Sequence, residues 1–120
     1  MYIPADSIHT GDITLESGQT LYFAGGAILK GCVYVDNTTD TKILGRGIIY
    51  QPSYDAVSAK FARKVTLDGI IAVNYGYDNS GRCAFRCGQS TNVTIRNYKA
   101  FEKNRWGDGI AVFLFDSRTD

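Results

Sequence analysis

The sequence has few of the residues that mark metal centres, disordered segments or membrane spans. It contains one histidine, His9, and two prolines among 120 residues. A single histidine gives no basis for a metal centre, so we expect no metal and no cofactor. No apolar run approaches about 18 residues, the length at which a spanning helix becomes a candidate, so we expect no membrane partner. Hydrophobic residues make up 44% of the chain and charged residues 21%, which argues for a folded domain.

An excess of charge of one sign is also missing. The net charge is +1, whereas nucleic-acid-binding platforms normally carry a clear basic excess, so no nucleic-acid partner is expected. The N-terminus, Met1 to Pro4, lacks a basic segment followed by an apolar one, so no signal peptide is visible in this chain. The length suits one domain, which we place over residues 1–120.

Cysteine is scarce and odd in number. The three residues are Cys32, Cys83 and Cys87, and an odd count denies a complete set of intramolecular disulfides. On a strand, residues 83 and 87 would share one face but lie about 13 Å apart, which is too far to bridge. We therefore expect small, free thiols.

What the sequence does contain is a repeat. In each of four short segments, an apolar position expected to face inward alternates with a position expected to face outward, as in a strand. Their starts lie 20, 24 and 28 residues apart, a spacing too long for hairpins but suited to the coils of a solenoid. The segments are Leu21-Tyr22-Phe23, Thr41-Lys42-Ile43, Val65-Thr66-Leu67 and Val93-Thr94-Ile95.

A second apolar run follows each of the first three segments, with glycine at the corner between them. These runs are Ala27-Ile28-Leu29, Ile48-Ile49-Tyr50 and Ile71-Ala72-Val73. Strands joined by turns without intervening helices predict an all-β fold, a right-handed parallel β-helix of about four to five coils. The predicted core is Leu21, Phe23, Ile28, Ile43, Ile48, Val65, Leu67, Ile71, Val93, Ile95, Ile110 and Val112.

Two stretches are expected to form loops at the corners of this solenoid. Residues 54–64 are the best candidate for a helix, but their apolar spacing is irregular and favours a corner loop that leads into Val65. Residues 74–88 are the longest insertion, and long loops on a solenoid flank often carry binding groups. A solvated loop whose aromatic side chains pack on the coil below remains the alternative.

Several segments resemble the coils of pectin-lyase-like right-handed β-helices. The most similar group is the polygalacturonase-like glycoside hydrolases of family 28, with the dextranase-like enzymes of family 49. The resemblance covers nearly the whole chain and implies the fold more directly than the substrate. The segments that carry it are Tyr2 to Asp6, Leu15 to Tyr22, Gly26 to Gly31, Ile43 to Ile49, Val65 to Ile70 and Asn92 to Asn97.

The catalytic part of the resemblance is confined to Trp106-Gly107-Asp108-Gly109-Ile110. The family usually has Asn-Thr-Asp-Gly-Ile-Asp there, so Asp108 matches its aspartate, while Trp106 and Gly107 replace Asn and Thr, and Ala111 replaces the last Asp. The resemblance implies that Asp108 is a catalytic carboxylate. Ordinary turn chemistry of the Asp-Gly pair is the alternative.

A second carboxylate is missing from this pattern. Inverting glycoside hydrolysis needs two carboxyl groups, one to protonate the leaving oxygen and one to activate water. The family's Asp-Asp pair would fall one coil after Asp108, beyond residue 120. The chain therefore resembles the N-terminal portion of such an enzyme, and we expect the 120 residues alone to be inactive.

Other residues are candidates for sugar binding. Trp106 offers an aromatic face for stacking on a sugar ring. Arg82, Arg86 and Arg105 could pair with the carboxylates of an acidic sugar. Tyr77 lies in the long insertion. Packing against a neighbouring coil, or ordinary surface exposure, is the alternative for each.

Three functions compete at this stage. The first is a polysaccharide-degrading glycoside hydrolase, secreted or periplasmic in its complete form, of which this chain is the N-terminal fragment. The second is a non-catalytic module that binds a polysaccharide or oligosaccharide along the coil flank. The third is a self-assembling module, because Ile110 to Phe115 is an apolar run with little sequence after it. An uncovered coil edge exposes unpaired backbone groups, so a homo-oligomer through the C-terminal coil edge is predicted.

Overall fold

The computed structural model describes residues 1–50, 52, 55–73, 83–101 and 108–113. All regular structure in these residues is β-strand, and within them no helix is long and apolar enough to cross a membrane. The strands are β1 Tyr2–Ile3, β2 Ile8–Thr10, β3 Ile13–Thr14, β4 Thr20–Phe23, β5 Ile28–Lys30, β6 Val33–Tyr34, β7 Thr39–Gly45, β8 Ile48–Tyr50, β9 Val57–Lys60, β10 Arg63–Asp68, β11 Ile71–Val73, β12 Cys83–Gly88, β13 Thr91–Arg96, β14 Lys99–Phe101 and β15 Asp108–Phe113.

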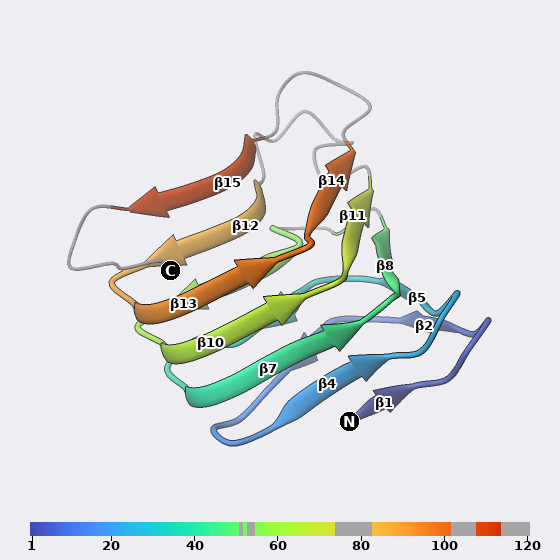
Figure 1. Cartoon of the computed structure of the whole chain (residues 1–120), viewed down its shortest axis with the longest axis horizontal. Coiled ribbons are helices and arrows are strands. Elements are labelled where there is room, and N and C mark those ends of the chain that lie inside the picture. The colour runs from blue at the N-terminus through green and yellow to red at the C-terminus, as the bar shows by residue number, and fades with distance from the viewer. Residues whose placement is uncertain (51, 53–54, 74–82, 102–107, 114–120) are drawn as a thin grey trace.

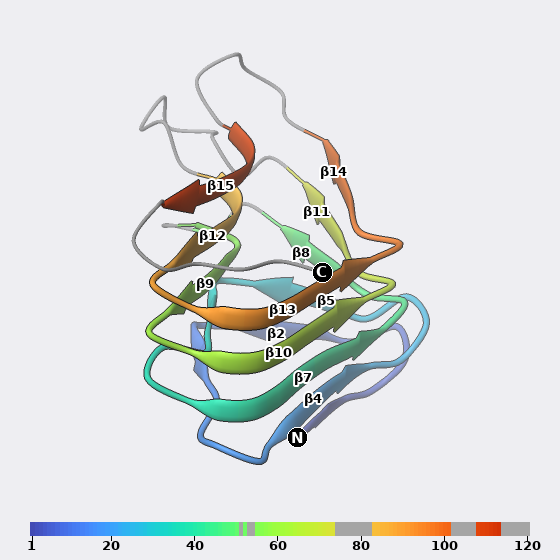
Figure 2. The same cartoon turned by 60° about the vertical axis from the view of Figure 1, so that its left-hand side comes forward.

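The strands form three parallel five-stranded sheets around one axis. Sheet A has the order β1-β4-β7-β10-β13, sheet B β2-β5-β8-β11-β14 and sheet C β3-β6-β9-β12-β15. In Figure 1 the strands of sheet A rise as successive rungs, and the chain returns behind them through sheets B and C. Figure 2 shows the same right-handed coil from a second side. The predicted all-β parallel solenoid is confirmed.

The register of sheet A differs from the one that the repeat predicts. Leu21 pairs with Ile43 rather than with Thr41, so this coil contains 22 residues instead of the predicted 20. The next two pairings, Ile43 with Leu67 and Leu67 with Ile95, keep the predicted spacings of 24 and 28. The error has a simple cause: side chains alternate with period two, so a shift of two residues preserves the inward face. Thr41 is itself buried.

The core is a column of inward side chains between the sheets. Of the predicted core, the buried residues are Leu21, Phe23, Ile43, Val65, Leu67 and Val93, and Ile95 packs against them partly buried. In sheet B the prediction is wrong by one position. Leu29, Ile49 and Ala72 face inward, while Ile28, Ile48 and Ile71 are half-buried and stack on one another outside. The glycine-containing corner resets the alternation between sheets A and B, which strand periodicity alone does not reveal. The side chains of Ile110 and Val112 lie outside the described residues.

Sheet C falls where the sequence predicts loops. Val57–Lys60 is strand β9 inside the predicted 54–64 loop, and Cys83–Gly88 is strand β12 inside the predicted 74–88 insertion. Phe85 is fully buried and belongs to the core. Cys32 and Cys87 are buried thiols that form no disulfide among the described residues, in agreement with the prediction. Residues 74–82 and 114–120 lie outside the described residues, so the C-terminal oligomer contact stays a prediction.

The corners between sheets are built from residues with positive φ angles that recur in columns. Such backbone is costly for most L-residues and is used where the chain must turn sharply. The columns are Asn37, Phe61 and Gln89; Asp40, Lys64 and Asn92; and Gly45, Gly69 and Asn97. In the last column, each residue contacts the preceding coil at the corner between sheets A and B. Neighbouring coils therefore pack closely at this corner.

Candidate functional site

The residues that the sequence singles out lie mostly outside the described part of the chain. Asp108 begins β15, in sheet C, and pairs in register with Cys83 of β12. Trp106, Arg105, Arg82 and Tyr77 fall outside the described residues. Their roles at a sugar site therefore stay predictions.

Arg86, one of the candidate sugar ligands, forms an ion pair within the fold. Its Nε forms an ion pair with Oδ2 of Asp55, and its Nη2 donates to Oδ1 of the same residue at 3.3 Å. Asp55 is completely buried and the Arg86 side chain is 18% exposed. Asp55 precedes β9 and Arg86 belongs to β12, so the pair joins two neighbouring coils of sheet C.

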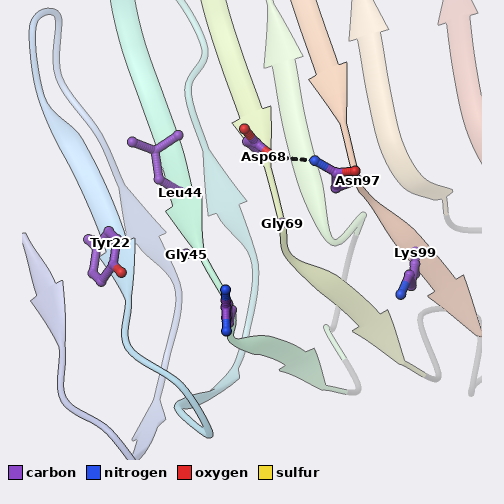
Figure 3. A pocket seen from close by; sticks show the side chains of 8 residues that line it. Tyr22, Leu44, Gly45, Asp68, Gly69, Asn97 and Lys99 are labelled. Atoms are coloured by element: carbon purple, nitrogen blue, oxygen red, sulfur yellow. Dashed lines mark hydrogen bonds between the residues drawn. The ribbon is translucent and has the colours of Figure 1, made fainter.

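A groove of about 580 Å³ opens on the outer surface where sheet A turns into sheet B. Figure 3 shows it from close by, with lining residues from four successive coils along one flank. Its lining residues come from the ends of β4, β7 and β10, from the corners that follow β7, β10 and β13, and from the start of β14. They are Tyr22, Leu44, Gly45, Arg46, Asp68, Gly69, Asn97 and Lys99.

An aromatic stack lies at one end of the groove, where Tyr22 is a lining residue. The rings of Tyr2 and Tyr22 are stacked, with centroids 5.9 Å apart and planes only 4° from parallel. Both remain open to solvent, at 61% and 44% exposure. They occupy one outward column of sheet A, which continues through Leu44 to Asp68. Tyr2, Tyr22 and Leu44 form what we call the apolar shelf.

Polar and charged groups form the other end. The Nδ2 atom of Asn97 donates a hydrogen bond to Oδ1 of Asp68 at 3.0 Å, drawn as a dashed line in Figure 3. This bond fixes one carboxylate oxygen of Asp68, and no hydrogen bond to the second is found within the described residues, so that oxygen can accept from a ligand. Arg46 and Lys99 are exposed, and within the described residues neither has an ion pair. The groove thus offers hydrogen-bond acceptors and exposed cations beside the apolar shelf.

Glycine lets neighbouring coils approach closely at the groove. A Cβ atom on Gly69 would lie 2.2 Å from the carbonyl oxygen of Gly45, and one on Gly45 would lie 2.0 Å from that of Phe23. Only bare backbone fits at these two corners. The column ends in Asn97, which tolerates a positive φ angle and supplies its amide to Asp68.

The sequence did not predict this groove, because the candidate binding residues were placed in the long insertion and around Asp108. Tyr2 and Tyr22 lie in segments that already carried the family resemblance, and both occupy outward positions. Their spacing of 20 residues was a usable signal of stacking. Asp68 and Asn97 are 29 residues apart, and only the register of β10 and β13 brings them together.

Among the residues that the structure describes, Asp68 is the one carboxylate that lines the groove, whereas glycoside hydrolysis needs two. The described residues contain no cluster of histidine, cysteine or acidic side chains that could hold a metal ion. Comparisons with protein-family models, curated proteins and solved structures found no match.

Proposed function

We propose that this β-helix binds a polysaccharide along its outer flank, with one stretch of the sugar chain in the groove between sheets A and B. The observation that carries the proposal is the exposed Tyr2–Tyr22 stack beside the Asp68–Asn97 pair. A pyranose ring has an apolar face and an edge of hydroxyl groups. An open aromatic shelf next to fixed hydrogen-bond acceptors complements both.

The extended form of the ligand follows from the solenoid itself. Solenoids present repeated surfaces on a long flank, where each coil adds one row of contacts. Neighbouring coils are about 4.8 Å apart, so a polymer can contact several coils at once. Tyr22, Leu44 and Asp68 already represent three successive coils in one column. A chain of sugars uses such a surface more fully than a compact small molecule.

A finer proposal comes from the motif around Asp108. Its similarity to polygalacturonase-like enzymes supports the hypothesis that the chain is the N-terminal portion of a glycoside hydrolase. Asp108 would then act from sheet C, on a different sheet from those that form the groove. The groove would hold the polymer on one flank while chemistry takes place on another.

The first prediction is that the 120 residues alone do not hydrolyse polysaccharides. The partner carboxylates that the family pattern implies for Asp108 are not among these 120 residues, and losing one of two cooperating groups already costs orders of magnitude in rate. Reducing-sugar assays on polygalacturonate and dextran should give no turnover above buffer. Turnover that is abolished by Asp108→Asn would contradict this prediction.

The second prediction concerns Tyr22. Replacing Tyr22 with alanine removes the ring at the centre of the apolar shelf, and we expect polysaccharide affinity to fall about tenfold, a loss of about 1.4 kcal/mol. Isothermal titration calorimetry against a panel of soluble polysaccharides measures the change. Tyr50→Ala is the matched control, because Tyr50 lies on the outer side of sheet B and does not line the groove.

The control separates binding from folding. Both tyrosines are outward and partly exposed, so each variant should unfold close to the midpoint of the parent chain. If Tyr50→Ala and Tyr22→Ala weaken binding equally, the sugar chain does not use the groove. If no polysaccharide in the panel binds, the proposed function itself is wrong.

A further inference from the structure

The outer side of sheet A carries far more positive charge than the whole chain. The net charge is only +1, but exposed basic side chains gather on the strands of sheet A and at the groove beside them. They are Lys42, Arg63, Lys64 and Arg96, continuing to Arg46 and Lys99 at the groove. We call this set the basic face. Figure 1 shows its strands β7, β10 and β13 side by side.

Few carboxylates offset these charges. Asp40 lies 4.0 Å from the Nζ atom of Lys64, and Asp68 is bonded to Asn97. For Lys42, Arg63 and Arg96 no ion pair is found within the described part of the chain. The net charge of the whole chain does not reveal this asymmetry. The stacking of the strands brings onto one face cations that are more than 50 positions apart in the sequence.

The positions of the cations follow the rungs of the sheet. Lys42 shares an outward column with Thr20, Thr66 and Thr94. Arg96 ends the column that contains the apolar shelf and Asp68. Since neighbouring rungs lie about 4.8 Å apart, charge, hydroxyl groups and the groove form one continuous surface across several coils.

We propose that the basic face binds an acidic polysaccharide, whose carboxylate or sulfate groups pair with these cations while its sugar rings reach the groove. This inference rests on the proposed function, because it names the charge of the same ligand. Arginine and lysine pair with carboxylate and sulfate oxygens through charge-assisted hydrogen bonds. A polymer with regularly spaced charges engages several cations at once, so the weak individual contacts reinforce one another.

The surface favours an acidic polysaccharide over a nucleic acid. Asp40 and Asp68 lie among the cations, and their carboxylates accept hydrogen bonds from sugar hydroxyls, which an acidic polysaccharide presents along its length and the backbone of duplex DNA lacks. The chain as a whole has a pI of about 7.7, whereas nucleic-acid-binding domains commonly exceed about 9. Threonine hydroxyls at 66 and 94 add neutral partners for a hydroxyl-rich ligand.

Polymers that differ only in charge test the inference. Dextran sulfate is compared with dextran, and polygalacturonate with its fully methyl-esterified form, by calorimetry with the whole 120-residue chain. We expect each charged polymer to bind at least about tenfold more tightly than its neutral counterpart, and the difference to shrink as salt screens the charges. The affinities for dextran sulfate and polygalacturonate show whether sulfate or carboxylate groups are preferred.

A variant of the face provides the second measurement. The triple variant Lys42→Gln, Arg63→Gln and Arg96→Gln keeps the groove residues and should lose at least about tenfold in affinity for the preferred charged polymer. Lys30→Gln is the control, since Lys30 is exposed on sheet B, where it approaches the ring of Tyr50. Its affinity should stay within about twofold of the parent chain.

Amide chemical-shift mapping uses the parent chain, so its result does not depend on whether the triple variant folds. Shifts on addition of the charged polymer should concentrate in β7, β10 and β13. Equal binding of charged and neutral polymers would overturn this inference and leave the proposed function standing, whereas no binding to any polysaccharide would overturn both. Tighter binding of duplex DNA than of either acidic polysaccharide, or shifts confined to sheet C, would also overturn it.

Discussion

Replacing Gly45 with alanine should destabilise the solenoid by about 3–5 kcal/mol, a large part of the stability of a small domain. Gly45 has a φ angle of 120°, a conformation that L side chains rarely adopt. A Cβ atom there would lie 2.0 Å from the carbonyl oxygen of Phe23 and 2.8 Å from its backbone carbon and nitrogen. The clash is with backbone, which no side-chain rotation can relieve.

The neighbouring coil cannot move away without loss. Phe23 pairs with Gly45 in the sheet, and its backbone oxygen also accepts from the N–H of Arg46 at 3.0 Å. Separating the two coils would break these hydrogen bonds and uncover the buried ring of Phe23. It would also distort the groove, which Gly45 lines. Stability and polysaccharide binding should therefore fall together.

Gly25→Ala is the matched control for this prediction. A Cβ atom at Gly25 would have no atom within 4 Å, and its backbone does not have a positive φ angle. The same change of residue should shift stability by less than about 0.5 kcal/mol. Urea unfolding followed by circular dichroism measures both variants. A Gly45→Ala midpoint equal to that of Gly25→Ala would show that the two coils are more loosely packed than the structure indicates.

Replacing Arg86 with methionine should cost about 3 kcal/mol, because it leaves the carboxylate of Asp55 buried without its cation. Asp55 is fully buried, while the guanidinium is 18% exposed, so solvent can offset only part of the loss. The pair ties the start of β9 to β12, and β12 in turn pairs with β15. Losing it should loosen sheet C, which also carries Asp108.

An exposed ion pair provides the comparison. Lys64 and Asp40 approach to 4.0 Å, but their side chains are 69% and 49% exposed. Lys64→Met should change the free energy of unfolding by no more than about 0.5 kcal/mol, since exposed pairs contribute little. Equal effects of Arg86→Met and Lys64→Met would show that Asp55 is better solvated than the structure indicates.

A double variant separates the pair from the packing around it. Combining Arg86→Met with Asp55→Asn removes both charges and should recover a substantial part of the loss, because no unpaired charge stays buried. If the double variant is as unstable as the sum of the single changes, the contribution comes from shape and not from the ion pair.

The sequence by itself determined the architecture of the coils. Alternating segments such as Val65-Thr66-Leu67, with glycine at 45 and 69, favour short strands and sharp corners and leave no helix between them. These preferences are local, so they can be recognised without knowing the partners of each strand. The inward positions in sheet A, Phe23 and Leu67 among them, followed directly from the alternation.

The tertiary structure alone decided how the coils align. The side-chain period of two allows Leu21 to face either Thr41 or Ile43, and a glycine corner resets which residues of sheet B point inward. The groove and the basic face depend on that alignment, because each gathers residues from different coils. Asp68 and Asn97, or Lys42 and Arg96, become neighbours on one surface only when the coils stack in a single register.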